Sequence, residues 1–94
     1  MNKYELAVVF VPTLEEEALK EEFEKVSALC ARFGGTIDKV DAWGKRRLAY
    51  EIRKVNEGYY YFISISAEPT FPRQMEERLR ITETILRYLI TRVE

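Results

Sequence analysis

The first third of the chain changes from a strand-like pattern to a helix-like one. Residues 2–11 are apolar on both faces of an alternating pattern, which is typical of a strand in the middle of a sheet. Pro12 ends this strand, and Thr13 with Glu16 forms a capping-box pattern that predicts the start of a helix. The helix is expected to continue to about residue 33, where Gly34 and Gly35 end it. Its apolar stripe consists of Leu19, Phe23, Val26, Cys30 and Phe33.

The middle of the chain is predicted to form two strands joined by a hairpin. The first strand spans about 36–53, with a bulge or bend expected at Gly44 and with buried-type side chains at Leu48, Tyr50 and Ile52. Residues 56–58, which read Asn-Glu-Gly, supply turn chemistry. The second strand then spans about 59–67. One face of it is apolar, and the other carries rings and hydroxyl groups.

The last third predicts a short helix over about 72–80 and a strand over about 84–93. The complete order is βαββαβ, which fits a single α+β domain spanning residues 1–94. Right-handed crossovers would place both helices on one face of a four-stranded antiparallel sheet. The other face is then left open.

The open face is expected to carry rings, aliphatic groups and cations, and is too apolar to be left simply in contact with water. Aromatic side chains there can stack on unpaired RNA bases, and flanking cations can neutralise phosphates. Contact with another protein is an equally good interpretation for Tyr60 and Phe62. The side chains expected on this face are Lys3, Val9, Tyr60, Phe62, Arg87 and Leu89.

Positive charge is concentrated in one segment, although the chain as a whole is nearly neutral. It has 15 Lys and Arg residues against 16 Asp and Glu residues, a net charge of −1. Residues 45–54 nevertheless hold five basic side chains against the single acid Glu51, whereas residues 13–24 hold six glutamates. The triplet Lys45, Arg46 and Arg47 on a strand would present cations at fixed spacing to phosphates. An ordinary solvated hairpin is the alternative.

Catalysis has no obvious set of residues. Histidine is absent, and neither a serine nor the single Cys30 lies beside a plausible base. Cys30 alone cannot form a metal site, and the glutamates are more typical of a solvated helix face. We therefore expect no catalytic residue, no metal, no cofactor and no small-molecule substrate. No apolar run is long enough for a membrane span, and the N-terminus lacks a secretory pattern, so a cytoplasmic protein is expected.

Two families share features with this sequence. Residues 58–62, Gly-Tyr-Tyr-Tyr-Phe, loosely resemble the third-strand signature of the RNA-recognition motif, although Glu57 and Tyr60 depart from it. A general single-stranded RNA-binding module is therefore the alternative. The block from Gly44 to Ile52, Gly-Lys-Arg-Arg-Leu-Ala-Tyr-Glu-Ile, is more specific. Together with the opening Lys-Tyr-Glu at residues 3–5, the Gly34-Gly35 helix exit, Trp43 and the later Gly-Tyr-Tyr at residues 58–60, it resembles the bacterial ribosomal small-subunit protein six family over essentially the whole chain.

This resemblance implies a ferredoxin-like fold and a noncatalytic role in the cytoplasmic ribosome. It implies binding to the central domain of small-subunit ribosomal RNA, cooperatively with ribosomal small-subunit protein eighteen. A domain with net charge −1 gains from a more basic companion when it binds RNA. The candidates for RNA contact are Lys3, Lys45, Arg46, Arg47, Arg87 and Arg92. The candidates for contact with RNA or with the protein partner are Tyr60, Phe62 and Leu89.

Overall fold

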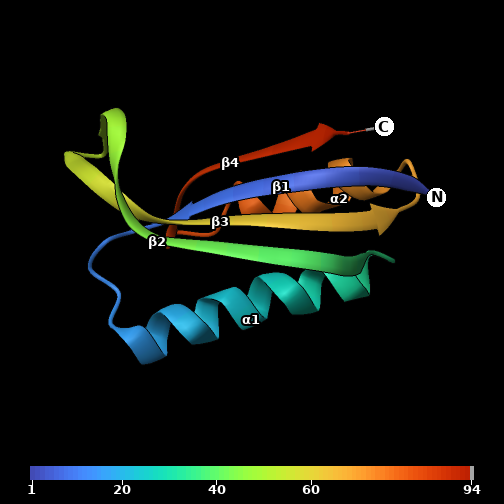
Figure 1. Cartoon of the computed structure of the whole chain (residues 1–94), viewed down its shortest axis with the longest axis horizontal. Helices are drawn as coiled ribbons and strands as arrows, with labels where there is room; N and C mark the ends of the chain where they lie inside the picture. The colour runs from blue at the N-terminus through green and yellow to red at the C-terminus, as the bar shows by residue number, and fades with distance from the viewer. Residues whose placement is uncertain (94) are drawn as a thin grey trace.

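The computed structural model describes residues 1–93 and has the predicted order of elements. Its four strands form one antiparallel sheet in the order β2-β3-β1-β4. Both termini lie at one end of this sheet, and the β2–β3 hairpin curls away at the other end (Figure 1). The elements are β1 (Asn2–Phe10), α1 (Glu16–Arg32), β2 (Thr36–Ile52), β3 (Val55–Ala67), α2 (Phe71–Leu79) and β4 (Ile85–Arg92). The predicted α+β, ferredoxin-like fold is confirmed.

One hydrophobic core lies between the sheet and the two helices. β1 contributes Leu6, Val8 and Phe10, which are fully buried. Because side chains alternate along a strand, the odd-numbered residues of β1 point to the open face. The thiol of Cys30 on α1 is buried, and burial raises its pKa to about 11. The helices add Val26, Cys30, Phe71, Met75 and Leu79 to this core.

The first helix ends as predicted but begins later. At its end the amide of Gly34 donates to the carbonyl of Ala31 at 3.1 Å, and Gly35 donates to Cys30 at 2.7 Å. At its start, Glu15 is the extended N-cap residue, and no side chain caps the helix. The capping-box prediction at Thr13 and Glu16 is therefore wrong. Thr13 lies in a turn before the helix, because the chain must first cross from the sheet to the helix layer.

The hairpin turn lies three residues before the position expected from the sequence. Arg53 and Lys54 form it, with φ values of 50° and 64°. Two residues with positive φ suit a two-residue hairpin because their twist matches that of the flanking strands. Residues 56–58 belong instead to β3. Gly58 is needed for packing, since a Cβ atom there would lie 2.4 Å from Cγ1 of Val9.

The outer half of β2 departs from simple alternation. The predicted bulge at Gly44 is confirmed, because the register with β3 shifts between Ala42 and Gly44, whose φ is 78°. The register is lost again between Arg47 and Ile52. Leu48 is buried as predicted, but Tyr50 is 60% exposed, so its prediction as a buried side chain is wrong. The hairpin has passed the end of β1 at this point, so no sheet lies beneath Tyr50.

Candidate nucleic-acid interface

The basic triplet is fully presented to solvent on the curled hairpin. Lys45, Arg46 and Arg47 are all exposed, and within residues 1–93 none of them forms an ion pair. Arg46 lies over the ring of Trp43, with its guanidinium carbon 5.7 Å from the ring centroid, and its Nε donates to the carbonyl of Trp43 at 3.1 Å. The ammonium of Lys45 lies 5.3 Å from the ring of Tyr59. The protein's own rings thus orient two of the three cations, while their charges stay available.

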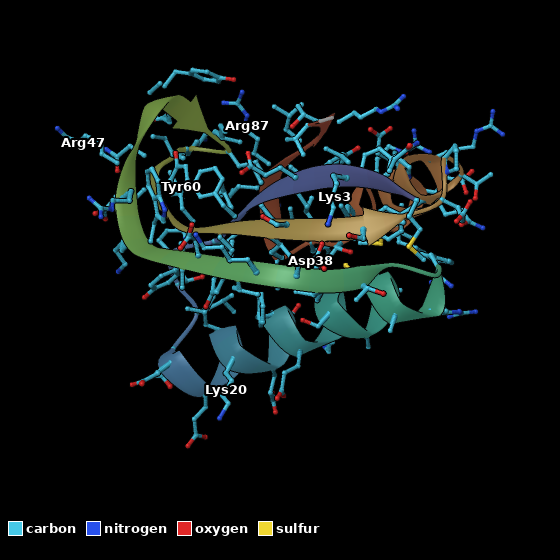
Figure 2. All side chains as sticks on the ribbon, turned by 45° about the vertical axis from the view of Figure 1, so that its right-hand side comes forward. Lys3, Lys20, Asp38, Arg47, Tyr60 and Arg87 are labelled. Carbon is cyan, nitrogen blue, oxygen red and sulfur yellow. The ribbon has the colours of Figure 1, made fainter. Side chains whose placement is uncertain are left out.

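Arg47 extends away from the body of the protein. In Figure 2 its side chain lies at the outer margin of the hairpin, whereas Tyr60 and Arg87 lie on the inner side of the curl. Lys3 and Asp38 lie farther along the sheet in the same view. The cations predicted to contact RNA therefore occupy more than one region.

The open face carries the predicted aromatic and aliphatic side chains. The register pairs Phe62 with Ala7, and Ala7 with Leu89, so these three residues share a face. Tyr60, Val9 and Arg87 are brought together in the same way. A shallow cavity of about 130 Å³ lies here, and most of its lining comes from these six residues. The expected composition of this end of the open face is confirmed.

Two exposed rings belong to this surface although the sequence pattern did not select them. Trp43 is 53% exposed, and its ring centroid lies 4.7 Å from that of Phe62. The guanidinium of Arg87 lies over the ring of Tyr50, with its central carbon 5.6 Å from the ring centroid. The position of Trp43, two residues before the basic triplet, was available in the sequence as an indication. Nothing in the sequence indicated that Tyr50 is exposed on this surface, because its orientation follows from the lost register of β2.

Lys3 and Arg92 lie at the other end of the sheet. Lys3 is on the open face and forms an ion pair with Asp38 at 3.5 Å. Asp38 also accepts a hydrogen bond from the hydroxyl of Ser66, and this bond, with Lys3 as a smaller contribution, lowers the pKa of Asp38. Arg92 is paired with the buried Tyr4, which places it on the helix side of the sheet. These two cations are therefore not joined to the hairpin.

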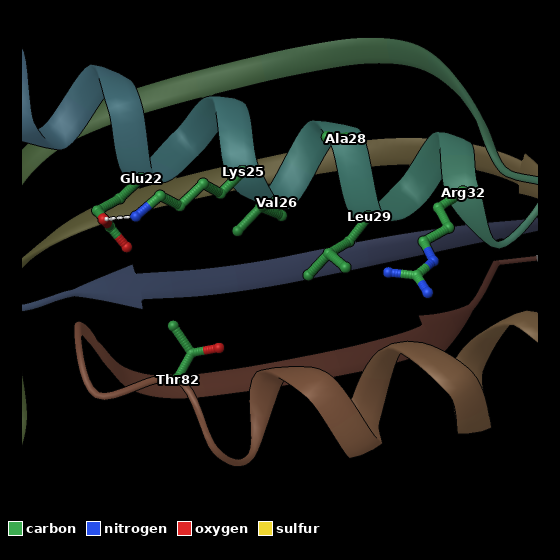
Figure 3. Close-up of a pocket in the computed structure, with 7 residues that line it drawn as sticks. All are labelled: Glu22, Lys25, Val26, Ala28, Leu29, Arg32 and Thr82. Carbon is green, nitrogen blue, oxygen red and sulfur yellow. Dashed lines mark hydrogen bonds and ion pairs between the residues drawn. The ribbon is translucent and has the colours of Figure 1, made fainter.

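A larger cavity lies on the helix side, between α1 and the segment after α2 (Figure 3). Its volume is about 370 Å³, and none of the predicted site residues lines it. At its edge Glu22 accepts hydrogen bonds from the hydroxyl of Thr84 at 2.7 Å and from Lys25 at 3.0 Å. These contacts, the one from Thr84 first, lower the pKa of Glu22.

Among residues 1–93, no three side chains of the metal-ligating types gather into a group that could hold a metal ion. In the same part of the chain, no helix is both long enough and apolar enough to cross a membrane.

Comparison with known proteins gives one consistent family. The family model for ribosomal protein S6 matches residues 3–92. Small ribosomal subunit protein bS6 of Clostridium kluyveri is 47% identical over 94 residues, covering 100% of this chain and 99% of that protein. The bS6 protein of Clostridium botulinum (strain Hall) is 44% identical over 90 residues, 96% of either chain. The crystal structure of 30S ribosomal protein S6 from Thermotoga maritima has a TM-score of 0.92 at 33% identity, covering 97% of this chain and 86% of that one.

Proposed function

The chain belongs to the ribosomal protein S6 family, and from this premise we propose that it binds the central domain of small-subunit ribosomal RNA together with ribosomal small-subunit protein eighteen. As a protein of the small ribosomal subunit, it is a structural component of the cytoplasmic ribosome. We propose the RNA, the protein partner and the surfaces that meet them from the features described below.

The observation that carries the RNA proposal is the state of the basic triplet. Three adjacent cations are exposed on the hairpin, and within residues 1–93 none of them forms an ion pair, although Glu57 is the strand partner of Arg47. The net charge of −1 provides little long-range attraction to RNA, so the attraction to phosphates must come from the local positive charge of the triplet. Two of the three cations are already oriented by Trp43 and Tyr59, which lowers the entropy cost of holding a phosphate. Arg87, held by Tyr50, extends the positive region onto the open face.

For the protein partner we propose the rest of the open face. Beside and beyond Phe62 this face carries the carboxylates of Glu5 and Asp41, whose strand partners are Ser64 and Phe62, and Asp41 forms an ion pair with Lys39 at 3.8 Å. Carboxylates repel phosphates, whereas they suit a basic protein. Burying the neighbouring apolar side chains, Phe62 and Leu89 among them, against a partner gives a favourable free energy. In this arrangement RNA meets the hairpin, and Tyr60 lies at the boundary between the two surfaces.

The salt dependence of binding tests the role of the triplet. In Arg46→Ala/Arg47→Ala, the protein with its partner should bind the ribosomal RNA more weakly. The logarithmic slope of affinity against salt should decrease by about 0.7 to 0.9 for each phosphate that the variant no longer neutralises. Lys20→Ala/Arg73→Ala is a matched control, since it removes two exposed cations from the helices. Lys20 points away from the sheet in Figure 2. An unchanged slope in the first variant would remove the triplet from the interface.

A further inference from the structure

The side chain of Arg53 joins the tip of the hairpin to the opposite side of the sheet. From the turn, its Nη1 donates to the carbonyl of Glu83 at 3.0 Å, and its Nη2 donates to the carbonyl of Ile85. These acceptors lie 30 and 32 residues farther along the chain, Glu83 just before β4 and Ile85 at its first residue. β4 is the far edge strand from β2, so the contact spans the end of the sheet. We call this pair of hydrogen bonds the Arg53 clamp.

Both ends of the clamp are anchored in the body of the protein. The segment that accepts the bonds is held by its own backbone, since Val11 donates to Thr84 at 2.8 Å. The hairpin side rests on the close approach of Gly58 to Val9 and Phe10. Between these anchors, however, the register of β2 is lost over residues 48–51. The side chain of Arg53 therefore restrains the part of the hairpin that the sheet ladder holds least.

We propose that Arg53 is a positioning residue for RNA binding, and this inference rests on the proposed function of the basic triplet. The clamp fixes the outer hairpin, so that Lys45, Arg46 and Arg47 meet RNA in one orientation. Without it, binding RNA must also order the hairpin, and that entropy cost reduces affinity. Arg53 acts through the triplet and does not itself contact a phosphate. Arginine suits this role because its planar fork donates to two carbonyl groups at once, which the single ammonium of lysine does not reproduce.

Two variants at Arg53 and one at its neighbour test the clamp with the same RNA and partner protein. Arg53→Lys keeps the charge, and Arg53→Ala removes it. Arg53→Lys can keep at most one of the two bonds and should weaken binding roughly fivefold, about the effect of losing one net hydrogen bond. Arg53→Ala loses both bonds and should weaken binding at least as much, while the salt slope of both variants stays at the wild-type value. Lys54→Ala is the control, because Lys54 lies in the same turn and its side chain makes no hydrogen bond or ion pair within residues 1–93. It should bind within twofold of wild type.

A coupling measurement separates positioning from a merely structural effect. In the Arg46→Ala/Arg47→Ala background, substituting Arg53 should cause much less additional loss of affinity, because the groups it positions are gone. Urea unfolding of each variant corrects every affinity for the folded fraction.

Several results would overturn the inference: full affinity in both Arg53 variants, a decreased salt slope in Arg53→Ala, an equal loss in Lys54→Ala, or fully additive losses in the triplet background. Failure of the wild-type pair to bind RNA would instead remove the proposed function. Wild-type binding with a weakened triplet variant and unaffected Arg53 variants would remove the clamp alone.

Discussion

Gly58→Ala is expected to destabilise the protein through a clash at the base of the hairpin. An added Cβ would lie 2.4 Å from Cγ1 of Val9 and 2.9 Å from the carbonyl oxygen of Phe10. Carbon atoms in favourable contact are about 3.5 to 4.0 Å apart, so the Val9 methyl group must move by about 1 Å. Valine has few χ1 rotamers with which to yield, and the Phe10 carbonyl belongs to the backbone.

The size of the effect follows from these contacts. Overpacking of this kind costs about 1 to 3 kcal/mol. The upper part of that range applies here, about 2 to 3 kcal/mol, because one of the close atoms is backbone and cannot rotate away. For a domain of this length the melting temperature should fall by roughly 10 to 20 °C. Urea unfolding followed by circular dichroism measures the free energy directly.

A second substitution identifies the cause. Val9→Ala removes the closest atom, so the double variant Gly58→Ala/Val9→Ala should be less destabilised than the sum of the single variants, by about 0.5 kcal/mol or more. Glu57→Ala is the local control, since Glu57 is an exposed neighbour on β3 and should change stability by no more than about 0.5 kcal/mol. A Gly58→Ala variant as stable as wild type, or strictly additive effects with Val9→Ala, would refute the packing argument.

Two further predictions concern the sheet faces and pH. Phe62→Ala should weaken binding of RNA or partner while costing less than about 2 kcal/mol of stability, whereas Ile63→Ala, fully buried on the opposite face, should cost about 2 to 5 kcal/mol; equal costs in urea unfolding would contradict the face assignment. The pKa of Glu22 is lowered below 4.5, so its contribution to stability is present above that pH and is lost as pH falls through the folded-state pKa. Glu22→Gln should therefore flatten the loss of stability between pH 7 and pH 3, and an equally steep loss would contradict this.

The success of the sequence predictions followed how strongly burial constrains each element. Along β1 and β3 one face packs on the core, so alternation predicted the neighbours of Phe62 and Tyr60 correctly. The helix stripe through Val26 and Cys30 was correct for the same reason. The start of α1 was wrong, because the Thr13 pattern describes a local preference and says nothing about the distance between layers.

The candidate site was harder to predict because it lies where the sheet ends. Tyr50 follows Leu48 by two residues, which indicates a shared face only while a ladder is intact. Arg53 and Lys54 gave no turn pattern, since positive φ is uncommon for such residues. The bonds of Arg53 to Glu83 and Ile85 join positions that no local pattern relates. The triplet itself was recognisable, because its composition alone sets its charge.

The central place of β1 in the sheet has a consequence for synthesis of the chain. Both of its neighbours, β3 and β4, are made after it, and Tyr4 pairs with Arg92. About 80 residues separate the end of β1 from the end of β4, so at about 5 to 20 residues per second the last partner follows some 4 to 16 s later. During that interval Leu6, Val8 and Phe10 have no complete sheet to join. In a nascent chain of this protein, the apolar side chains of β1 must therefore be protected from aggregation until translation of the domain is almost finished.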